Sequence, residues 1–233
     1  MRYSLIHELK REKASLQDFI RWYCFHRKSP LRYETFRFNG RNYLYCIHHH
    51  NHTWRNERAI EIPIFLNLLH QYPPEVVLEI GNVLSHYRRL THDVVDKYEI
   101  SFRRSIIRED VLTYTPKRRY DLCISISTFE HIGLDEGNKD QEKILGLTTS
   151  FQRFLNPGGR VIFSIPLGYN LFLDESIFNG KVPLANCSFM HRVSADNRWE
   201  QTDMFTAFKR QYGKPYPSAN ALLIGEYREN DDR

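Results

Sequence analysis

The sequence predicts an α/β fold built around a mostly parallel sheet, and two patterns indicate it. The first is a series of short apolar runs, between residues 75 and 227, separated by helical or loop segments. Such runs are typical of strands that are buried on both faces beneath crossover helices. The second is the pair Asn39 and Gly40 at the centre of the alternating sequence YETFRFNGRNYLYCI. An Asn-Gly pair between alternating apolar residues is a strong β-hairpin signal.

The predicted strands follow one another along most of the chain. They are EVVLEI (75–80), HDVVD (92–96), SIIRED (105–110), YDLCISIS (120–127), GRVIFSIP (159–166), SFMHRV (188–193) and NALLIGEY (220–227). We expect the last two to pair as an antiparallel hairpin, and a polar helix is expected near residues 139–154.

A smaller unit is predicted before this sheet. Residues 3–27 place apolar side chains at helical spacing, which predicts one or two amphipathic helices that end before Pro30. With the hairpin, they would form an N-terminal helical and hairpin cap over residues 1–55. Residues 56–233 would form the main domain.

The main domain is predicted to begin with a helix in the segment NERAIEIPIFLNLLHQY, residues 56–72. Asn56 is the expected N-cap, because Asn is favoured there. Pro63 lacks a backbone N–H, so it should kink this helix or mark its true start. Pro73 and Pro74 should close it.

The composition is that of an ordinary globular protein. The chain has 233 residues, of which 41% are hydrophobic and 26% charged, so one sizeable core is expected. No apolar run approaches the roughly 20 residues that span a bilayer, and the amino terminus is too charged for a secretory signal. The four cysteines are scattered, which predicts neither disulfides nor a thiolate metal site. These features predict a cytoplasmic protein.

Positive charge is concentrated near the amino terminus. Residues 1–58 carry 12 Lys and Arg against 5 Asp and Glu, and the remainder carries 21 against 23. Aromatic residues are interleaved with this charge, a combination that could bind nucleic acid. A solvated basic face over an aromatic mini-core explains the pattern as well, and no RNA-binding motif is present. Nucleic acid is therefore a possible partner but not the favoured one.

Acidic residues follow the first strands of the predicted sheet. Glu79 precedes Gly81, Asp96 ends the second strand, Glu109 and Asp110 end the third, and the fourth runs into ISTFEHIG. Ligands of α/β sheets collect at the carboxyl ends of the strands. Each acid alone could cap a helix or begin a turn. Because four strand ends carry acids, together they favour a binding site.

This series resembles the class I S-adenosylmethionine-dependent methyltransferases, as does YDLCISISTFEHIG followed by LNPGGRVIFSIP. The resemblance covers roughly residues 57–227. It implies a Rossmann-like methyltransferase sandwich with a seven-stranded sheet and S-adenosylmethionine as cofactor. Gly81 would let the methionine part lie against backbone, with Glu79 as an anchor, and Asp96 would take the ribose hydroxyls. The remaining positions implied to contact the cofactor are Asp110 and Val111 at the adenine, and Ser127 after the fourth strand.

The first loop departs from the family pattern. Val83 and Ser85 replace two family glycines, and the 15 positions from Gly81 to Asp96 leave space for about two turns of helix. Side chains of Asn82 and Ser85 could replace the lost backbone contacts. The loop argues against a nicotinamide dehydrogenase, which needs close approach to a pyrophosphate. A noncatalytic relative that keeps the fold as a binding or scaffold module stays open.

Several residues could serve chemistry near this loop. His131, beside Glu130, could deprotonate an acceptor at neutral pH, although the pair could instead stabilise a helix start. Tyr169 could form an acceptor wall. Further predicted substrate contacts are Asn170 as a hydrogen-bond donor, Arg58 toward a carboxylate or phosphate, and His52 from a substrate-facing loop.

The segment CIHHHNHTW carries four histidines at positions 48, 49, 50 and 52. Adjacent strand residues point to opposite faces and thiolate or carboxylate partners are not nearby, so no metal site is predicted. The sequence thus predicts methyl transfer to a small-molecule or glycan-type oxygen or nitrogen nucleophile. The alternatives are the noncatalytic module and an RNA-modifying methyltransferase. The acceptor and the oligomeric state are not predicted.

Overall fold

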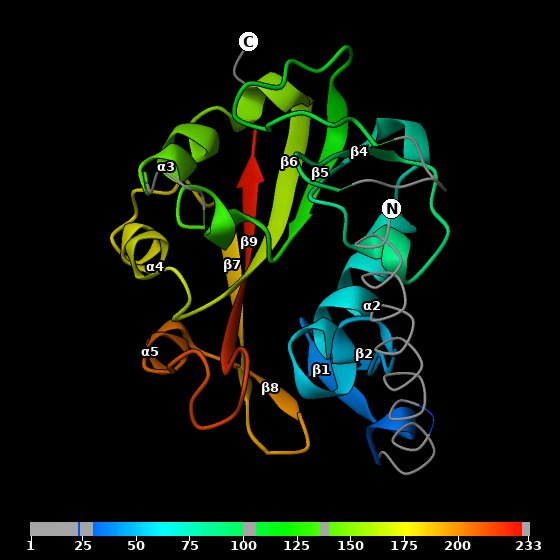
Figure 1. The fold of residues 1–233 in the computed structure, drawn as a ribbon, viewed down its shortest axis with the longest axis vertical. Helices are drawn as coiled ribbons and strands as arrows, with labels where there is room; N and C mark the ends of the chain where they lie inside the picture. The colour runs from blue at the N-terminus through cyan, green and yellow to red at the C-terminus, as the bar shows by residue number, and fades with distance from the viewer. Residues whose placement is uncertain (1–22, 24–29, 100–105, 136–139, 230–233) are drawn as a thin grey trace, which may run out of the picture.

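A computed structural model describes residues 23, 30–99, 106–135 and 140–229. The helices predicted within residues 3–27 lie outside the described residues, apart from Tyr23. In the described part, a seven-stranded sheet has the order β4-β3-β5-β6-β9-β7-β8 (Figure 1). Its strands are β3 (Val77–Ile80), β4 (Asp93–Val95), β5 (Tyr120–Ile126), β6 (Leu155–Pro166), β7 (Asn186–Arg192), β8 (Trp199–Thr202) and β9 (Ala221–Arg228).

The sheet is mostly parallel, as predicted. Strands β3 to β7 run in one direction, and β8 and β9 run in the other. Beyond β4, Ile107 pairs with Val95 in a parallel bridge. From this bridge to β6 the strand order is 3-2-1-4-5, the Rossmann order, whose reversal point lies between β3 and β5. The antiparallel β9 follows β6, which confirms the predicted Rossmann-like methyltransferase sandwich.

Helices α3 (Lys143–Thr148) and α4 (Leu171–Phe178) cover one face of the sheet, and α2 (Arg58–Leu69) covers the other (Figure 1). We call these the α3 face and the α2 face. Alternation along the strands separates two cores. On β5, Cys123 belongs to the α3 core, whereas Leu122 and Ile124 belong to the α2 core. Among the described helices, none is long and apolar enough to cross a membrane.

The predicted hairpin is confirmed as β1 (Thr35–Phe38) and β2 (Arg41–Leu44). Asn39 and Gly40 form its turn with positive φ angles of 47° and 80°, as a type I′ turn requires. Phe36 and Phe38 point inward and join the α2 core. The hairpin therefore packs onto the α2 face rather than standing free.

Helix α2 continues through Pro63 without ending there. Proline has no N–H, so the carbonyl of Ala59 lacks its usual helical partner. The amide of Cys46 donates to that carbonyl at 2.8 Å instead. The N-cap is Glu57 rather than Asn56, although Asn56 Oδ1 accepts from the Arg58 amide at 3.2 Å. The carbonyl that Pro63 leaves without a helical partner thus links the helix to the segment that leaves the hairpin.

Two expectations about the remaining elements are wrong, and a third is partly right. β7 pairs with β9 in antiparallel fashion, but the hairpin partner of β7 is β8, which the apolar runs did not reveal. The loop after Gly81 forms only the 3-10 turn η4 (Leu84–His86) instead of two helical turns. The helix near residues 139–154 is α3 followed by η6 (Phe151–Phe154). The other short elements are η1 (Pro30–Tyr33), η2 (His50–Arg55), η3 (Pro74–Val76), η5 (Phe129–His131) and α5 (Met204–Phe208).

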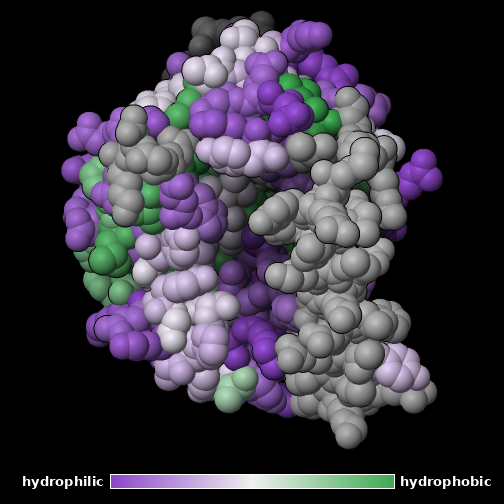
Figure 2. All heavy atoms as spheres, viewed as in Figure 1, coloured by the Kyte–Doolittle hydropathy of each residue, from purple (hydrophilic) through white to green (hydrophobic). Residues whose placement is uncertain are grey.

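The visible surface is mostly hydrophilic. Figure 2 shows hydrophobic residues mainly over the side that carries α3 and α4, and hydrophilic residues within the central hollow. A polar hollow beside an apolar core is a place where ligand chemistry can occur.

Candidate active site

A cavity of about 280 Å³ lies at the carboxyl ends of β3, β4 and β5. Backbone bonds align the loops that form it: Gly81 N donates to Val95 O at 2.9 Å, and Asp96 N donates to Ile107 O at 3.0 Å. The structure brings five predicted site residues together there, namely Gly81, Asp96, Asp110, Val111 and His131. The lining also includes Ile80, Val95, Lys97, Tyr98, Glu109, Thr128, Ile132 and Asp135. We call this the strand-end cavity.

Glu79 does not line the cavity but holds the loop beneath it. Its side chain is fully buried, and Oε1 accepts from the amides of Val83 and Leu84 at 2.8 Å each. Its Oε2 lies 2.7 Å from Nε2 of the buried His92. A buried carboxylate needs such partners to offset its desolvation. Glu79 is therefore an anchor of the loop from within the core.

Asp96 lines the cavity with much of its hydrogen-bonding capacity already used. Its Oδ2 accepts from Asn82 N at 2.9 Å, and its Oδ1 accepts from Tyr98 N and Glu99 N at 2.8 Å each. A carboxylate offers about four acceptor sites, so about one is left on Oδ2. Ser85 donates to Asn82 Oδ1 at 2.6 Å. Asn82 and Ser85 thus stabilise the loop and are not among the cavity-lining residues.

Asp110 forms an ion pair with Lys97 in the lining of the strand-end cavity. Lys97 Nζ lies 2.8 Å from Asp110 Oδ2, and the Leu112 amide donates to Oδ1 at 3.0 Å. Burial raises the pKa of Asp110, but the Lys97 and Leu112 hydrogen bonds and the Lys97 charge outweigh it. The pKa of the carboxyl therefore lies below its ordinary value, and Asp110 is an ionised acceptor.

Gly81 allows a close contact that any other residue would block. Its φ is +83°, and a Cβ at this position would lie 2.4 Å from Thr128 Oγ1. Thr128 follows β5 and also lines the strand-end cavity. Sequence reasoning missed Thr128, although it lies in the quoted ISTFEHIG segment. The glycine therefore lets β5 and its loop approach the end of β3.

Two of the predicted catalytic residues meet through a third residue. His131 Nδ1 lies 2.5 Å from Asp135 Oδ2, and Tyr169 donates its hydroxyl to the same oxygen at 2.8 Å. The His131 and Tyr169 rings meet edge to face at 4.9 Å. Burial and the bond to Asp135 raise the pKa of Tyr169 to about 12, which keeps the phenol protonated. A carboxylate on Nδ1 leaves Nε2 as the nitrogen that can accept a proton.

Glu130 lies behind His131 and is only 2% exposed. Its Oε1 is 3.6 Å from His131 Nε2, and its Oε2 has no hydrogen-bond partner among the described residues. Burial, with smaller contributions from Glu61 and Glu57, raises its pKa well above the ordinary value. Asn170 donates to the Glu130 carbonyl at 2.9 Å and caps α4 through the Leu173 amide. Asn170 thus positions this loop instead of facing an acceptor directly.

A buried ionic cluster lies on the α2 face beside Glu130. Arg58 contacts Glu61 Oε2 at 2.5 Å, and Glu61 Oε1 accepts from Ser127 and Ser164 at 2.6 Å each. Ser127, predicted at the cofactor, therefore has its hydroxyl bound to Glu61. Burial and the charge of Glu61 raise the pKa of the nearby Glu57. The cluster combines one guanidinium with three carboxyl groups when Glu130 is included.

The histidine segment packs against the first loop rather than into the strand-end cavity. His50 stacks on His86 with ring centres 4.2 Å apart, and burial together with neighbouring histidines lowers the pKa of His50 to about 4. His52 has a φ of 47°, and its ring meets Trp54 at 5.2 Å. Across the described ranges, no three His, Cys, Asp or Glu side chains are grouped as metal ligands.

Comparisons with known proteins give structural relatives only. No family model matches the chain, and no curated protein sequence matches it. The N-methyltransferase NodS from Bradyrhizobium japonicum WM9, in complex with S-adenosylhomocysteine, is 14% identical. It matches over 74% of this chain and 87% of its own, with a TM-score of 0.47.

Two further solved structures are similar. A possible histamine N-methyltransferase from Thermotoga maritima is 11% identical over 70% of this chain and 86% of its own, with a TM-score of 0.40. The Burkholderia thailandensis 1,6-didemethyltoxoflavin-N1-methyltransferase, with S-adenosylhomocysteine, is 15% identical over 72% and 76%, also at 0.40. All three are named as methyltransferases. Because their identities and TM-scores are low, the fold assignment rests on the strand order described above.

Proposed function

We propose that the chain is an S-adenosylmethionine-dependent methyltransferase that acts on a small-molecule or glycan-type oxygen or nitrogen nucleophile. One observation carries the proposal: the strand-end cavity lies at the reversal point of the sheet, and its lining includes Asp96, Asp110 and His131. Ligand sites of Rossmann-like sheets lie at this point. Acids from separate strands and a base from the next loop thus surround one space.

The strand-end cavity fits a nucleoside. Ile80, Val95, Val111 and Ile132 supply apolar walls on which a purine could pack. The free site on Asp96 Oδ2 could accept from a ribose hydroxyl. Asp110, ionised beside Lys97, could accept from an exocyclic amino group. These four walls and two acceptors are the residues that we propose would hold the adenosine part.

The buried ionic cluster supports a polar ligand group next to that nucleoside. Glu130 Oε2 and the Tyr87 hydroxyl are buried without hydrogen-bond partners among the described residues. An unsatisfied buried polar atom costs about 1–3 kcal/mol. Arg58 lies close enough to both that its charge lowers their pKa values against the raising effect of burial. We therefore propose that the amino-acid end of the cofactor or the acceptor binds near Arg58.

His131 would act as the general base. When bound, S-adenosylmethionine supplies a methyl group on a cationic sulfonium. Asp135 holds the imidazole by Nδ1, so that Nε2 can take the proton of an acceptor hydroxyl or amine. Tyr169 fixes Asp135 by donating to it. Because most of the acceleration in methyl transfer comes from alignment, this network has to orient one proton transfer and little else.

Cofactor binding is tested by isothermal titration with S-adenosylhomocysteine and by thermal unfolding in its presence. We expect measurable heat and a stabilisation that grows with ligand concentration, about 2.7 kcal/mol at 100-fold above Kd. Asp96→Ala should weaken binding. Asp93→Asn is the matched control, because Asp93 lies at the opposite end of the same strand and contacts Arg118. No heat and no thermal shift at millimolar ligand would remove the cofactor from the proposal.

Turnover separates the enzyme from a noncatalytic binding module. With labelled cofactor and an acceptor library, His131→Ala should lose about 10²- to 10⁴-fold in kcat while it retains affinity for S-adenosylhomocysteine. Binding without turnover on any acceptor would favour the noncatalytic module. The hydrogen bonds that Asp96 and Asp110 already make within the protein give this alternative some support.

The RNA-modifying alternative depends on residues 1–58, most of which precede the described hairpin. Nucleic-acid affinity that falls steeply with salt would support it.

The division of the chain is also a proposal. We propose that residues 1–55 cap the acceptor side of a domain formed by residues 56–233. The packing of the hairpin on α2, the helix that carries Arg58, supports this arrangement.

A further inference from the structure

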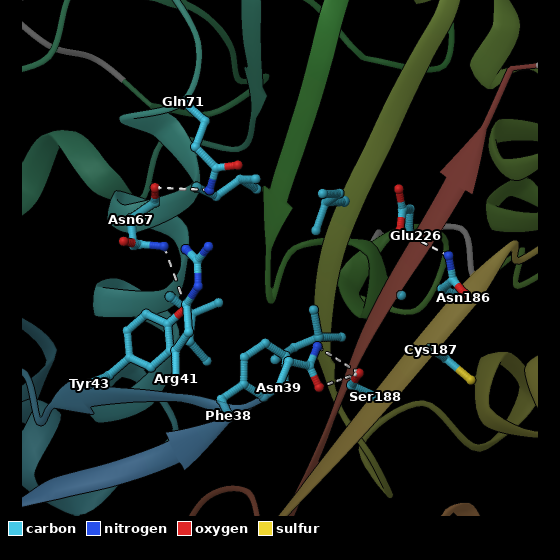
Figure 3. A pocket seen from close by; sticks show the side chains of 15 residues that line it. Phe38, Asn39, Arg41, Tyr43, Asn67, Gln71, Asn186, Cys187, Ser188 and Glu226 are labelled. Atoms are coloured by element: carbon cyan, nitrogen blue, oxygen red, sulfur yellow. Dashed lines mark hydrogen bonds between the residues drawn. The ribbon is translucent and has the colours of Figure 1, made fainter.

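A second cavity lies on the α2 face, between the β1–β2 hairpin, helix α2 and strands β6, β9 and β7 (Figure 3). Its volume is about 250 Å³, and it shares no lining residue with the strand-end cavity. We call it the hairpin pocket. Sites for drug-sized ligands begin at roughly 300 Å³, so this space fits a somewhat smaller molecule.

The floor of the hairpin pocket is apolar. Ile64 and Leu68 line it from α2, and Ile162 and Ile224 line it from β6 and β9. Phe38 adds an aromatic side chain from the hairpin. A ligand that rests here needs at least one face without polar groups.

The walls carry side-chain amides from different elements, as Figure 3 shows. Asn67 donates to the Tyr43 hydroxyl at 3.4 Å, Gln71 donates to the Asn67 carbonyl at 3.4 Å, and Asn186 donates to Glu226 at 3.2 Å. In each case the amide NH₂ group is engaged. Within the described part of the chain, no hydrogen bond reaches Asn67 Oδ1, Gln71 Oε1 or Asn186 Oδ1. The walls therefore keep acceptors for a ligand that donates.

Two charged residues line the hairpin pocket, and they differ in their partners. The guanidinium of Arg41 makes no ion pair or hydrogen bond with any described residue, so it is a free donor. Glu226 accepts from Arg160 at 3.3 Å, from Arg228 at 2.8 Å and from Asn186. Although burial raises the pKa of Glu226, these hydrogen bonds outweigh it and place the pKa below its ordinary value. Glu226 is thus an ionised carboxylate whose charge is already paired with Arg160 and Arg228, and Arg41 is the charged side chain left for a ligand.

We propose that the hairpin pocket binds a neutral saccharide of one or two rings. A sugar hydroxyl donates and accepts, so it matches both the free amide oxygens and Arg41. The C–H face of a pyranose would cover the apolar floor. A simple anion could use Arg41 but has no donors for the amide oxygens, and a purely apolar ligand would leave both the amides and Arg41 without partners. The proposal is independent of methyl transfer, because the two cavities share no residue.

The test is calorimetric titration of the full chain with glucose, galactose, N-acetylglucosamine and their disaccharides at millimolar concentration. At least one neutral sugar should give a saturable heat of binding. Arg41→Ala and Gln71→Ala, both at exposed positions that line the hairpin pocket, should weaken this binding at least tenfold. Arg37→Ala, an exposed arginine on the outer side of the same hairpin, should not.

Three outcomes would overturn the proposal. They are the absence of binding heat with every neutral sugar, binding that survives unchanged in both pocket variants, and equal binding of inorganic phosphate or cyclohexanol. Thermal unfolding of each variant shows whether it is folded. The titrations are made without S-adenosylhomocysteine, so their outcome does not depend on the proposed methyl transfer.

Discussion

The two faces of the central sheet are built from the same strands but bury different chemistry. On β6, Phe163 and Ile165 enter the α3 core, whereas the neighbouring Ser164 lies on the α2 face and bonds to Glu61. On β3, Leu78 and Ile80 enter the α3 core, whereas Glu79 is buried with His92. The α3 face is held mainly by apolar packing, and the α2 face adds buried ions to it.

This difference between the two faces indicates that the α2 face is the one shaped by a functional site. Buried ions are costly unless every one is paired, and their replacement by apolar residues is often neutral or stabilising. Their presence on the α2 face, next to the carboxyl ends of β3 and β5, therefore calls for a reason other than stability. The adjoining strand-end cavity supplies that reason under the proposed function.

The largest expected effect comes from removing one partner of the Arg58–Glu61 ion pair on the α2 face. Glu61→Ala leaves Arg58 buried without its carboxylate, together with two serines without their acceptor. We expect a loss of about 3–5 kcal/mol in the free energy of unfolding, measured with urea. The double variant Arg58→Met/Glu61→Leu should lie much closer to the native chain, because it removes both charges. Equal losses in the two variants would show that the serines, not the ion pair, dominate.

The charged exception on the α3 face, Asp174, should behave in the opposite way. Burial raises its pKa to about 6 from an ordinary value of 3.8. The native state then binds more protons than the unfolded state between these values, so stability falls as pH rises through this range. The full cost at neutral pH is about 3 kcal/mol at most.

Asp174→Asn keeps an acceptor for the Gly168 amide, which lies 2.6 Å from Asp174 Oδ2. It should stabilise the chain above about pH 6 and remove the slope contributed by this carboxyl. Urea unfolding of both chains between about pH 4 and pH 8 checks this. Parallel pH profiles for the two chains would contradict the shifted pKa.

Gly81→Ala tests the contact between the end of β3 and the β5 loop. The new Cβ would overlap Thr128 and also adopt a strained positive φ, so we expect a loss of about 1–3 kcal/mol. Gly40→Ala is the matched control, because Gly40 has φ +80° but nothing within 4 Å of the added Cβ. The difference between the two variants in urea unfolding measures the contact alone. Identical losses would show that backbone strain accounts for the whole effect.

The smallest predicted effect is at Cys123, a fully buried residue of the α3 core. Cys123→Ser places a hydroxyl among apolar neighbours and should cost about 1–2 kcal/mol. Ser125→Ala, on the same strand, removes a hydroxyl that donates to the Ile80 carbonyl at 3.1 Å and is the comparison. Thermal unfolding of both ranks them. A stabilised Cys123→Ser variant would contradict the apolar character assigned to this face.

Much of the fold was predictable because its strands are apolar runs. Strand β8 was not, since Glu200 and Gln201 are exposed and only its pairing with β7 makes it a strand. The helix for which the sequence leaves space after Gly81 does not form, and a tertiary contact accompanies the 3-10 turn that replaces it. His86 stacks on His50 there, and the sequence does not reveal a contact between residues so far apart.

The candidate site was predictable where backbone topology alone decides position. Gly81, Asp96, Asp110 and Val111 meet because parallel strands end at one edge. Side-chain partners were not predictable from the sequence. Ser127 was therefore predicted to contact the cofactor, whereas in the structure its hydroxyl donates to Glu61. Asp135 was missed despite a usable signal: it follows His131 by four positions, a spacing that brings side chains together in a helical turn.

Pro63 has a consequence for how helix α2 is attached. Because the Ala59 carbonyl accepts from the Cys46 amide, a backbone hydrogen bond ties the first turn of α2 to the chain that leaves the hairpin. Arg58 lies in that turn, next to Ala59. A proline that removes a hydrogen bond within the helix therefore provides an attachment point for another segment, and the chain after the hairpin holds the start of the helix that carries Arg58.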